Sequence, residues 1–317
     1  MVDAGGLRIV FFGTPQFAVP TLDLLLKSRH CVVGVVSQPD RPRGRGQRTT
    51  DAPVKVTALS AGLPIVQPQQ LKDPALLDRL RELDADLAVV AAYGRLIPET
   101  LLALPRLGMI NVHASLLPRY RGAAPVHRAV MAGERLTGVT IMRLVKEMDA
   151  GPILAVADRP IDPNETSEEV ERDLARLGAE LLVSTVDTMA IGRAEESPQD
   201  DRLATLAPRL TKEDGLIAWS WPAERIHNQI RGLHPWPHAF TFLRDHRLIL
   251  LRSTWSPTGS GASPGTILAA AGDHLDVAAG EGIVRVTEIQ PEARRPMSAR
   301  DFLAGHHLVG GDRFGAP

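Results

Sequence analysis

The fold class is decided by one stretch near the start of the chain, Arg8-Ile9-Val10-Phe11-Phe12-Gly13-Thr14-Pro15. Its four successive apolar residues favour extended backbone and predict a β-strand over residues 8–12, after which Gly13 turns the chain. Thr14 is a suitable N-cap and Pro15 a suitable first residue for a helix that follows at once. A strand that leads directly into a helix opens a strand–helix–strand unit, so this stretch predicts a parallel sheet.

The same order of elements continues through the first 190 residues. The second predicted strand, 32–36, has no polar alternation, as expected for a strand that is buried on both faces. A helix begins at Asp73-Pro74, and a third buried strand covers residues 87–92. We therefore predict an α/β fold with a Rossmann-like, doubly wound, mostly parallel sheet. Further predicted elements are strands near 109–113, 138–144 and 153–161 and a long helix after the capping box Thr166…Glu169.

The second half of the chain has a different pattern. From residue 193 to residue 208 Glu, Asp, Ser and Pro prevail, which predicts a linker. A predicted helix near Ala223–Arg231 is followed by five strand-like runs, at 240–244, 247–254, 265–270, 274–278 and 283–289. Five short strands within about 100 residues predict a small OB-like β-barrel. The predicted domains are therefore 1–192 and 209–317, joined by the linker 193–208.

The composition restricts the possible classes of protein. The 317 residues carry a formal net charge of −1 and 44% are apolar, and the single cysteine, Cys31, excludes an internal disulfide and a cysteine-cluster metal site. The N-terminus lacks the pattern of a signal peptide, and no apolar run approaches the ~20 residues that span a bilayer. We therefore expect a cytoplasmic protein with no membrane partner. The first turn, Gly13-Thr14-Pro15-Gln16-Phe17, is not G-x-G-x-x-G, which argues against dinucleotide binding.

The segment with the most chemistry follows the predicted strand 109–113. Asn111 and His113 are two residues apart on that strand, so their side chains share a face near its carboxyl end, where parallel sheets bind ligands. An amide and an imidazole that converge there can stabilise an oxyanion and transfer a proton. The alternative is that both side chains only bond backbone groups at the strand end.

A second polar element is Met148-Asp149-Ala150-Gly151, which lies between two apolar runs. An aspartate near a histidine can orient the imidazole and accept a proton. The alternatives are that Asp149 only shapes a turn before glycine, or that the neighbouring Glu147 takes the role. Neither a serine elbow nor a suitably placed cysteine is evident, so direct transfer is favoured over a covalent intermediate.

These motifs resemble one known family. The set Asn111-x-His113-x-Ser115-Leu116-Leu117-Pro118, with Arg121-Gly122-Ala123-Ala124-Pro125 and Asp149-x-Gly151, is similar to the folate-dependent formyltransferases. From Leu7 to about Gly311 the chain resembles the branch of that family that acts on aminoacyl-tRNA. It departs from the family at Ala114, where many relatives carry glycine, and at residues 146–148 before the aspartate.

The resemblance implies an activity and a role for each motif. By this resemblance, a formyl group would move from N10-formyltetrahydrofolate to the amine of methionine carried by the initiator tRNA. Asn111 and His113 would hydrogen-bond the formyl oxygen, and Asp149 would accept the amine proton and orient His113. The folate would contact Ser115, Leu116, Leu117 and Pro118 and the backbone of Tyr93 and Gly94. No metal is implied.

The resemblance also assigns the tRNA to two regions. The loop from Asp40 to Arg48 has a net charge of +3, and Arg41, Arg43 and Arg45 would hold the acceptor end through phosphates. The alternative is a solvated basic loop. The C-terminal domain would hold the tRNA body, although residues 209–317 contain nearly equal numbers of basic residues (twelve) and acidic residues (eleven).

Two other functions remain open from the sequence alone. One is formyl transfer to an amino-sugar nucleotide, which shares the three catalytic residues but has no need of an arginine-rich loop. The other is a non-catalytic RNA-binding protein on the same scaffold, which has no need of the Asn111, His113 and Asp149 set. In each case a monomer suffices.

Overall fold

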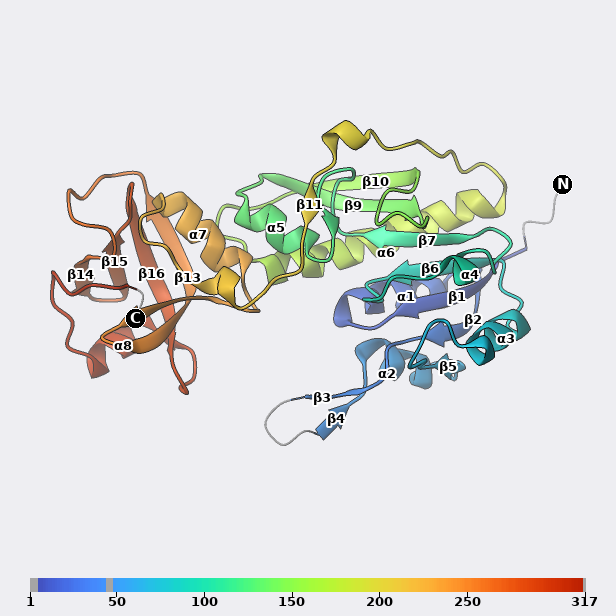
Figure 1. Cartoon of the computed structure of the whole chain (residues 1–317), viewed down its shortest axis with the longest axis horizontal. Coiled ribbons are helices and arrows are strands. Elements are labelled where there is room, and N and C mark those ends of the chain that lie inside the picture. The colour runs from blue at the N-terminus through green and yellow to red at the C-terminus, as the bar shows by residue number, and fades with distance from the viewer. Residues whose placement is uncertain (1–4, 44–47, 316–317) are drawn as a thin grey trace. The chain divides into compact units, whose positions relative to one another are not determined.

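The structure is a computed structural model that describes residues 5–43 and 48–315. The chain divides into two units that interleave along the sequence (Figure 1). The first unit contains Met1–Ala123, Gly138–Arg159 and Glu171–Ala207. The second unit contains Ala124–Thr137, Pro160–Val170 and Pro208–Pro317.

The first unit is built on a seven-stranded sheet with the order β10-β9-β7-β6-β1-β2-β5. β1 pairs in parallel with β2 and β6, β6 with β7 and β2 with β5, whereas β9 runs antiparallel to β7. The predicted mostly parallel sheet is therefore confirmed. Its strands are Arg8–Gly13 (β1), Cys31–Val36 (β2), Ile65–Val66 (β5), Leu87–Ala91 (β6), Met109–His113 (β7), Leu136–Arg143 (β9) and Ile153–Pro160 (β10).

Helices cover both faces of this sheet. Leu76 and Leu80 of α3 and Leu101 of α4 pack in one apolar cluster with Val10 and Val90. On the opposite face α6 approaches closely, since a Cβ added at Gly178 would lie 2.8 Å from Val112. The helical segments of the described chain up to residue 203 are Gln16–Ala18 (η1), Val19–Lys27 (α1), Pro53–Ser60 (α2), Pro74–Glu82 (α3), Glu99–Leu102 (α4), Pro125–Met131 (α5), Ser167–Ala190 (α6) and Asp201–Leu203 (η2).

The start of the first helix differs from the prediction. α1 begins at Val19 after the short 3-10 turn η1, and Thr14 is not its N-cap and Pro15 is not its first residue. The Thr14 hydroxyl instead accepts a hydrogen bond from the Gln38 amide (3.3 Å) and donates one to the Tyr93 carbonyl (3.4 Å). Gln38 follows β2 and Tyr93 follows β6, so Thr14 joins the carboxyl ends of three neighbouring strands.

Two short strand pairs complete the first unit. β3 (Arg41–Arg43) and β4 (Arg48–Thr50) pair antiparallel and extend away from the main sheet (Figure 1). β8 (Arg121–Gly122) and β11 (Leu206–Ala207) pair in parallel. The second of these pairs lies beside the candidate site.

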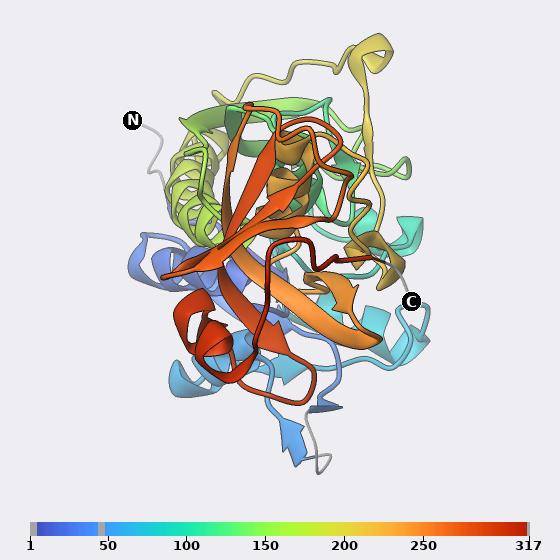
Figure 2. The same ribbon diagram turned by 90° about the vertical axis from the view of Figure 1, so that its left-hand side faces the viewer.

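The second unit contains an antiparallel sheet with the order β12-β13-β16-β15-β14, and β17 pairs with the edge of β16. The C-terminal segment contacts both ends of this path (Figure 2). Gly315 forms an isolated β-bridge with Phe242 of β12, and Arg313 forms another with Thr266, just before β14. The strands thus form a closed path, as a barrel requires. Besides α5, the described elements of this unit are Glu213–Gly215 (η3), Ala223–Gly232 (α7), Ala239–Leu243 (β12), His246–Ser256 (β13), Ile267–Ala271 (β14), His274–Ala278 (β15), Ile283–Pro291 (β16), Met297–Ser298 (β17) and Ala299–Gly305 (α8).

Candidate active site

The centre of the site is the carboxyl end of β7. Asn111 and His113 lie opposite Met142 and Thr140 of β9, so strand alternation places both side chains on one face of the sheet. His113 is buried, at 5% exposure, whereas Asn111 is half-buried. Within the described part of the chain the Asn111 carboxamide has no hydrogen-bond partner in the protein. It is therefore available to an oxygen atom of a substrate.

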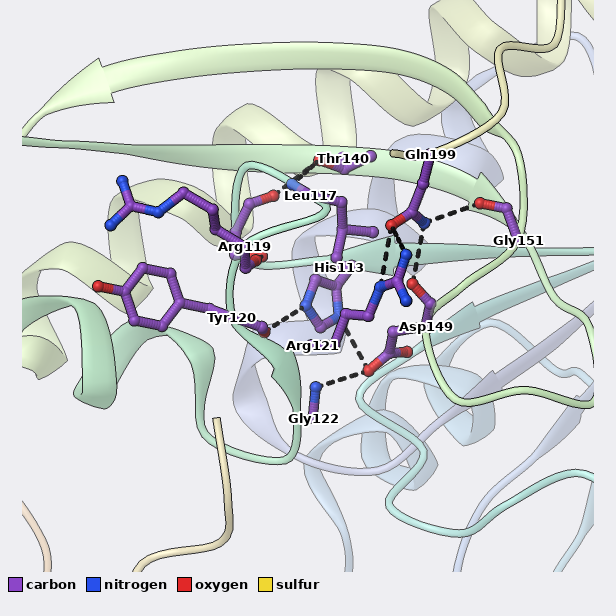
Figure 3. A network of polar contacts seen from close by, with 11 residues as sticks. His113, Leu117, Arg119, Tyr120, Arg121, Gly122, Thr140, Asp149, Gly151 and Gln199 are labelled. Carbon is purple, nitrogen blue, oxygen red and sulfur yellow. Dashed lines mark hydrogen bonds and ion pairs between the residues drawn. The ribbon is translucent and has the colours of Figure 1, made fainter. Parts of the chain in front are cut away.

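The two ring nitrogens of His113 have different surroundings. Nε2 lies 3.1 Å from the carbonyl oxygen of Tyr120 (Figure 3). Because a carbonyl oxygen only accepts, Nε2 must carry a proton in this arrangement. Nδ1 faces Oδ2 of Asp149 at 3.8 Å, which is an ion-pair distance when the ring is protonated. Nδ1 is thus the ring nitrogen that is left to interact with the carboxylate or with a substrate.

Asp149 is held in an unusual backbone conformation beside His113. Its φ angle is +51°, in the left-handed region that few non-glycine residues adopt. Oδ2 accepts a hydrogen bond from the Gly122 amide at 2.8 Å, and among the described residues Oδ1 has no hydrogen-bond partner. Glu147 on the same turn is exposed. Of the two acidic candidates, Asp149 is the one that meets His113.

The segment after β7 is tied back to β9. The Thr140 hydroxyl donates to the Ser115 carbonyl (2.7 Å) and accepts from the Leu117 amide (3.1 Å), while the Ser115 hydroxyl donates to the Arg119 carbonyl (2.7 Å). Ser115 and Leu117 are buried, and Leu116 and Pro118 are half-buried. Ala114 is not among the residues with positive φ, so its backbone conformation does not require glycine.

Tyr93 and Gly94 follow β6, the strand next to β7. The Tyr93 ring is buried against Phe12, and its carbonyl accepts a 2.6 Å hydrogen bond from the Gln38 side chain. Gly94 has a φ angle of +81° and is exposed. Directly after it lies a cavity of about 380 Å³, lined by Gln69, Gln70, Leu71, Lys72, Arg95, Leu96, Ile97 and Pro98. The cavity is formed by segments that follow β5 and β6, at the carboxyl edge of the sheet.

The predicted linker, residues 193–208, also contributes to the site, and the sequence did not indicate this. The Gln199 side chain bonds the backbone carbonyls of Asp149 and Gly151 and the guanidinium of Arg121 (Figure 3). The Thr205 carbonyl accepts a hydrogen bond from the backbone amide of Arg121. Nothing in a stretch rich in Ser, Pro and Asp indicated these contacts. Only the polarity of Gln199 next to Pro198 was visible in the sequence.

The candidate tRNA loop is anchored at its base. Lys55 of α2 contacts Asp40, which precedes β3, and Asp51, which follows β4. The hydrogen bond from Lys55 lowers the pKa of the Asp40 carboxyl below its ordinary range. Arg41 and Arg43 belong to β3, whereas Arg45 lies outside the residues that the structure describes.

Comparison with known proteins identifies the family. The Formyl transferase model matches residues 7–186, and the Formyl transferase, C-terminal domain model matches residues 209–307. Proteins named methionyl-tRNA formyltransferase from Citrifermentans bemidjiense and Moorella thermoacetica are each 46% identical to the chain, over 98% of its length and 97% and 99% of theirs. The chain belongs to the methionyl-tRNA formyltransferase family. The residues at the candidate site lie inside the first match, except Gln199 and Thr205, which fall between the two matches.

The fold is shared with formyltransferases of lower similarity. An N-formyltransferase from Helicobacter canadensis, in complex with folinic acid and dTDP-3-aminofucose, superimposes with a TM-score of 0.68 at 17% identity. The superposition covers 88% of this chain and 98% of that one. In the described ranges 5–43 and 48–315, no helix could cross a membrane and no group of three acidic, histidine or cysteine residues could hold a metal ion.

Proposed function

We propose that this formyltransferase moves the formyl group of N10-formyltetrahydrofolate to the amine of methionine on initiator tRNA, and so forms N-formylmethionyl-tRNA for translation initiation. The observation that carries the proposal is the meeting of His113 and Asp149, with 3.8 Å between Nδ1 and Oδ2, on the face that also bears Asn111. The names of relatives that are 46% identical over nearly the whole chain support methionyl-tRNA as the acceptor.

The three residues divide the chemistry of acyl transfer. As the amine attacks the formyl carbon, negative charge develops on the formyl oxygen and positive charge on the nitrogen. The Asn111 amide and the protonated Nδ1 of His113 donate hydrogen bonds to that oxygen. Oδ1 of Asp149 accepts the proton of the amine, directly or through water, while the negative charge of the carboxylate stabilises the protonated imidazole. The oxyanion then collapses, the bond between the formyl carbon and N10 breaks, and N10 takes up the proton that the amine lost, so that tetrahydrofolate leaves.

The folate is a co-substrate, and the residues present fit it. Ser115, Leu116, Leu117 and Pro118 form the segment tied to Thr140, and Tyr93 and Gly94 offer backbone groups to the pterin. The cavity that follows Gly94 falls within the size range of small-molecule sites, about 300–1,000 Å³. It combines leucine, isoleucine and proline side chains with Lys72 and Arg95, which suits a ligand that joins flat rings to carboxylates.

The tRNA is assigned to the arginine loop and the second domain. Arg41, Arg43 and Arg45 hold phosphates of the acceptor end, and residues 209–317 hold the tRNA body. In this proposal residues 1–192 form the catalytic domain, 193–208 connect the two domains, and an OB-like barrel occupies 209–317. The protein acts as a monomer in the cytoplasm.

One assay separates this function from its alternatives. The protein is incubated with N10-formyltetrahydrofolate and either initiator methionyl-tRNA or an amino-sugar nucleotide, and the formylated product is quantified. We expect formylation of the tRNA alone. Formylation of the sugar alone would refute the proposed substrate, and inertness toward both would favour the non-catalytic RNA-binding alternative.

A further inference from the structure

The carboxamide of Gln199 is hydrogen-bonded at every position it offers. Nε2 donates to the carbonyls of Asp149 (2.9 Å) and Gly151 (2.8 Å). Oε1 accepts from Nε (3.1 Å) and Nη2 (2.7 Å) of Arg121 (Figure 3). A primary amide has two N–H donors and two lone pairs, so all four are used. Such complete pairing indicates that the contacts define the position of both neighbours.

The two hydrogen bonds that Gln199 donates hold the turn that carries Asp149. The left-handed backbone of Asp149 is strained for a residue that carries a Cβ, so the surrounding contacts must maintain it. Gln199 bonds the carbonyl of Asp149 itself and that of Gly151, two residues later. Because the direction of the Asp149 side chain follows its backbone, these two bonds aim the carboxylate at His113.

The two hydrogen bonds that Gln199 accepts hold the segment whose backbone binds the Asp149 carboxylate. Gly122 donates its amide to Oδ2 of Asp149, and Arg121 is the residue before it. Gln199 fixes the Arg121 guanidinium, and the Thr205 carbonyl accepts from the Arg121 amide at 2.8 Å. β11 then pairs with residues 121–122, and its approach is so close that a Cβ added at Gly122 would lie 2.6 Å from the Ala207 carbonyl. The same segment thus fixes both ends of the Gly122–Asp149 hydrogen bond.

We propose that Gln199 is a positioning residue for formyl transfer, which acts by holding Asp149 against His113 and Gly122. The inference rests on the proposed role of Asp149 as the proton acceptor. Glutamate at position 199 would direct a carboxylate oxygen at two carbonyl oxygens, and methionine would keep the size but remove all four hydrogen bonds. Asparagine is one methylene shorter and cannot reach both partners from the same backbone.

The first test compares kcat with KM in the full-length protein. We expect Gln199→Met and Gln199→Glu to lower kcat by about 10- to 100-fold, the range for a catalytic group displaced by about 1 Å. The KM values for formyl donor and methionyl-tRNA should stay near those of the wild type, because the Gln199 carboxamide makes all four of its hydrogen bonds within the protein. Arg202→Ala is the matched control, since Arg202 lies on the same segment, is largely exposed and pairs only with Asp200 among the described residues. All rates are measured well below the lowest melting temperature of the set.

The second test asks whether Gln199 acts through Asp149. Single-turnover formylation is measured for Asp149→Asn, Gln199→Met and the double variant. If Gln199 only positions Asp149, adding Gln199→Met to Asp149→Asn changes the rate by less than about twofold, whereas independent effects multiply. Multiplying effects, or a kcat of Gln199→Met within threefold of wild type, would overturn the inference. Full activity of Asp149→Asn would instead refute the proposed role of Asp149, so the two failures are distinguishable.

Discussion

The charge of Asp149 is the feature whose removal should affect turnover most selectively. In Asp149→Asn the carboxamide oxygen can still accept the Gly122 amide, so the turn is retained while the negative charge is lost. Two opposite charges 3.8 Å apart interact by about 4 kcal/mol at an effective dielectric constant of ~20. At about 1.4 kcal/mol for each factor of ten, the loss predicts a decrease in the rate of formyl transfer of roughly 10³-fold. This value lies within the range of about 10²–10⁴ for general acid–base groups.

The assay is single-turnover formylation of methionyl-tRNA with enzyme in excess, which isolates chemistry from product release. Glu147→Gln is the matched control, since Glu147 lies on the same turn and carries the same charge but is exposed. We expect Glu147→Gln to retain full activity and the tRNA affinity of both variants to be unchanged. A rate for Asp149→Asn within tenfold of wild type, or a greater loss in Glu147→Gln, would refute the assignment of the proton acceptor.

Three further predictions concern other residues. Asn111→Ala should lower kcat by about 10²–10³-fold with little change in KM, as for the loss of an oxyanion donor, and steady-state kinetics will check this. The Arg252 guanidinium lowers the pKa of Glu169 to about 2 from its ordinary 4.5, a difference worth about 2 kcal/mol after screening of a side chain that is 29% exposed. This stability is present above pH 4.5 and is lost as the pH falls toward 2. Denaturant unfolding should therefore show Glu169→Gln less stable than wild type at pH 7 but nearly equal to it near pH 2. Arg45→Ala should weaken tRNA binding and reduce its salt dependence in filter-binding assays while the single-turnover rate at saturation stays close to wild type.

Local sequence signals predicted the elements that depend on local interactions. Asp73 caps α3 through a 3.0 Å hydrogen bond to the Ala75 amide, and Thr166 and Glu169 form the predicted capping box, because each motif needs only neighbouring residues. The same reasoning failed at Thr14. Its hydroxyl is used by residues that are 24 and 79 positions away, and these long-range partners override its preference for an N-cap.

The site was only partly predictable for the same reason. Strand alternation placed Asn111 and His113 on one face, and the family resemblance suggested Asp149. The contribution of Gln199 was invisible, because a glutamine in an irregular stretch carries no periodicity and no local motif. Closure of the sheet in the second unit by residues 313–315 was also unpredictable, since bridges at both ends of a short segment depend on where distant strands lie.

The antiparallel direction of β9 explains why the site needs support from so far along the chain. Arg143, at the end of β9, lies opposite Ile110, so the turn toward β10 starts three residues before His113, or about 10 Å along β7. Asp149 reaches His113 only if this turn folds back along β7, past Asn111. Such a turn has no strand partner of its own, and its unpaired carbonyls need donors from elsewhere. Gln199 supplies two of these donors. The same path that brings the Asp149 carboxylate and the Asn111 amide to one reaction centre therefore also makes the catalytic geometry depend on the segment that contains Gln199.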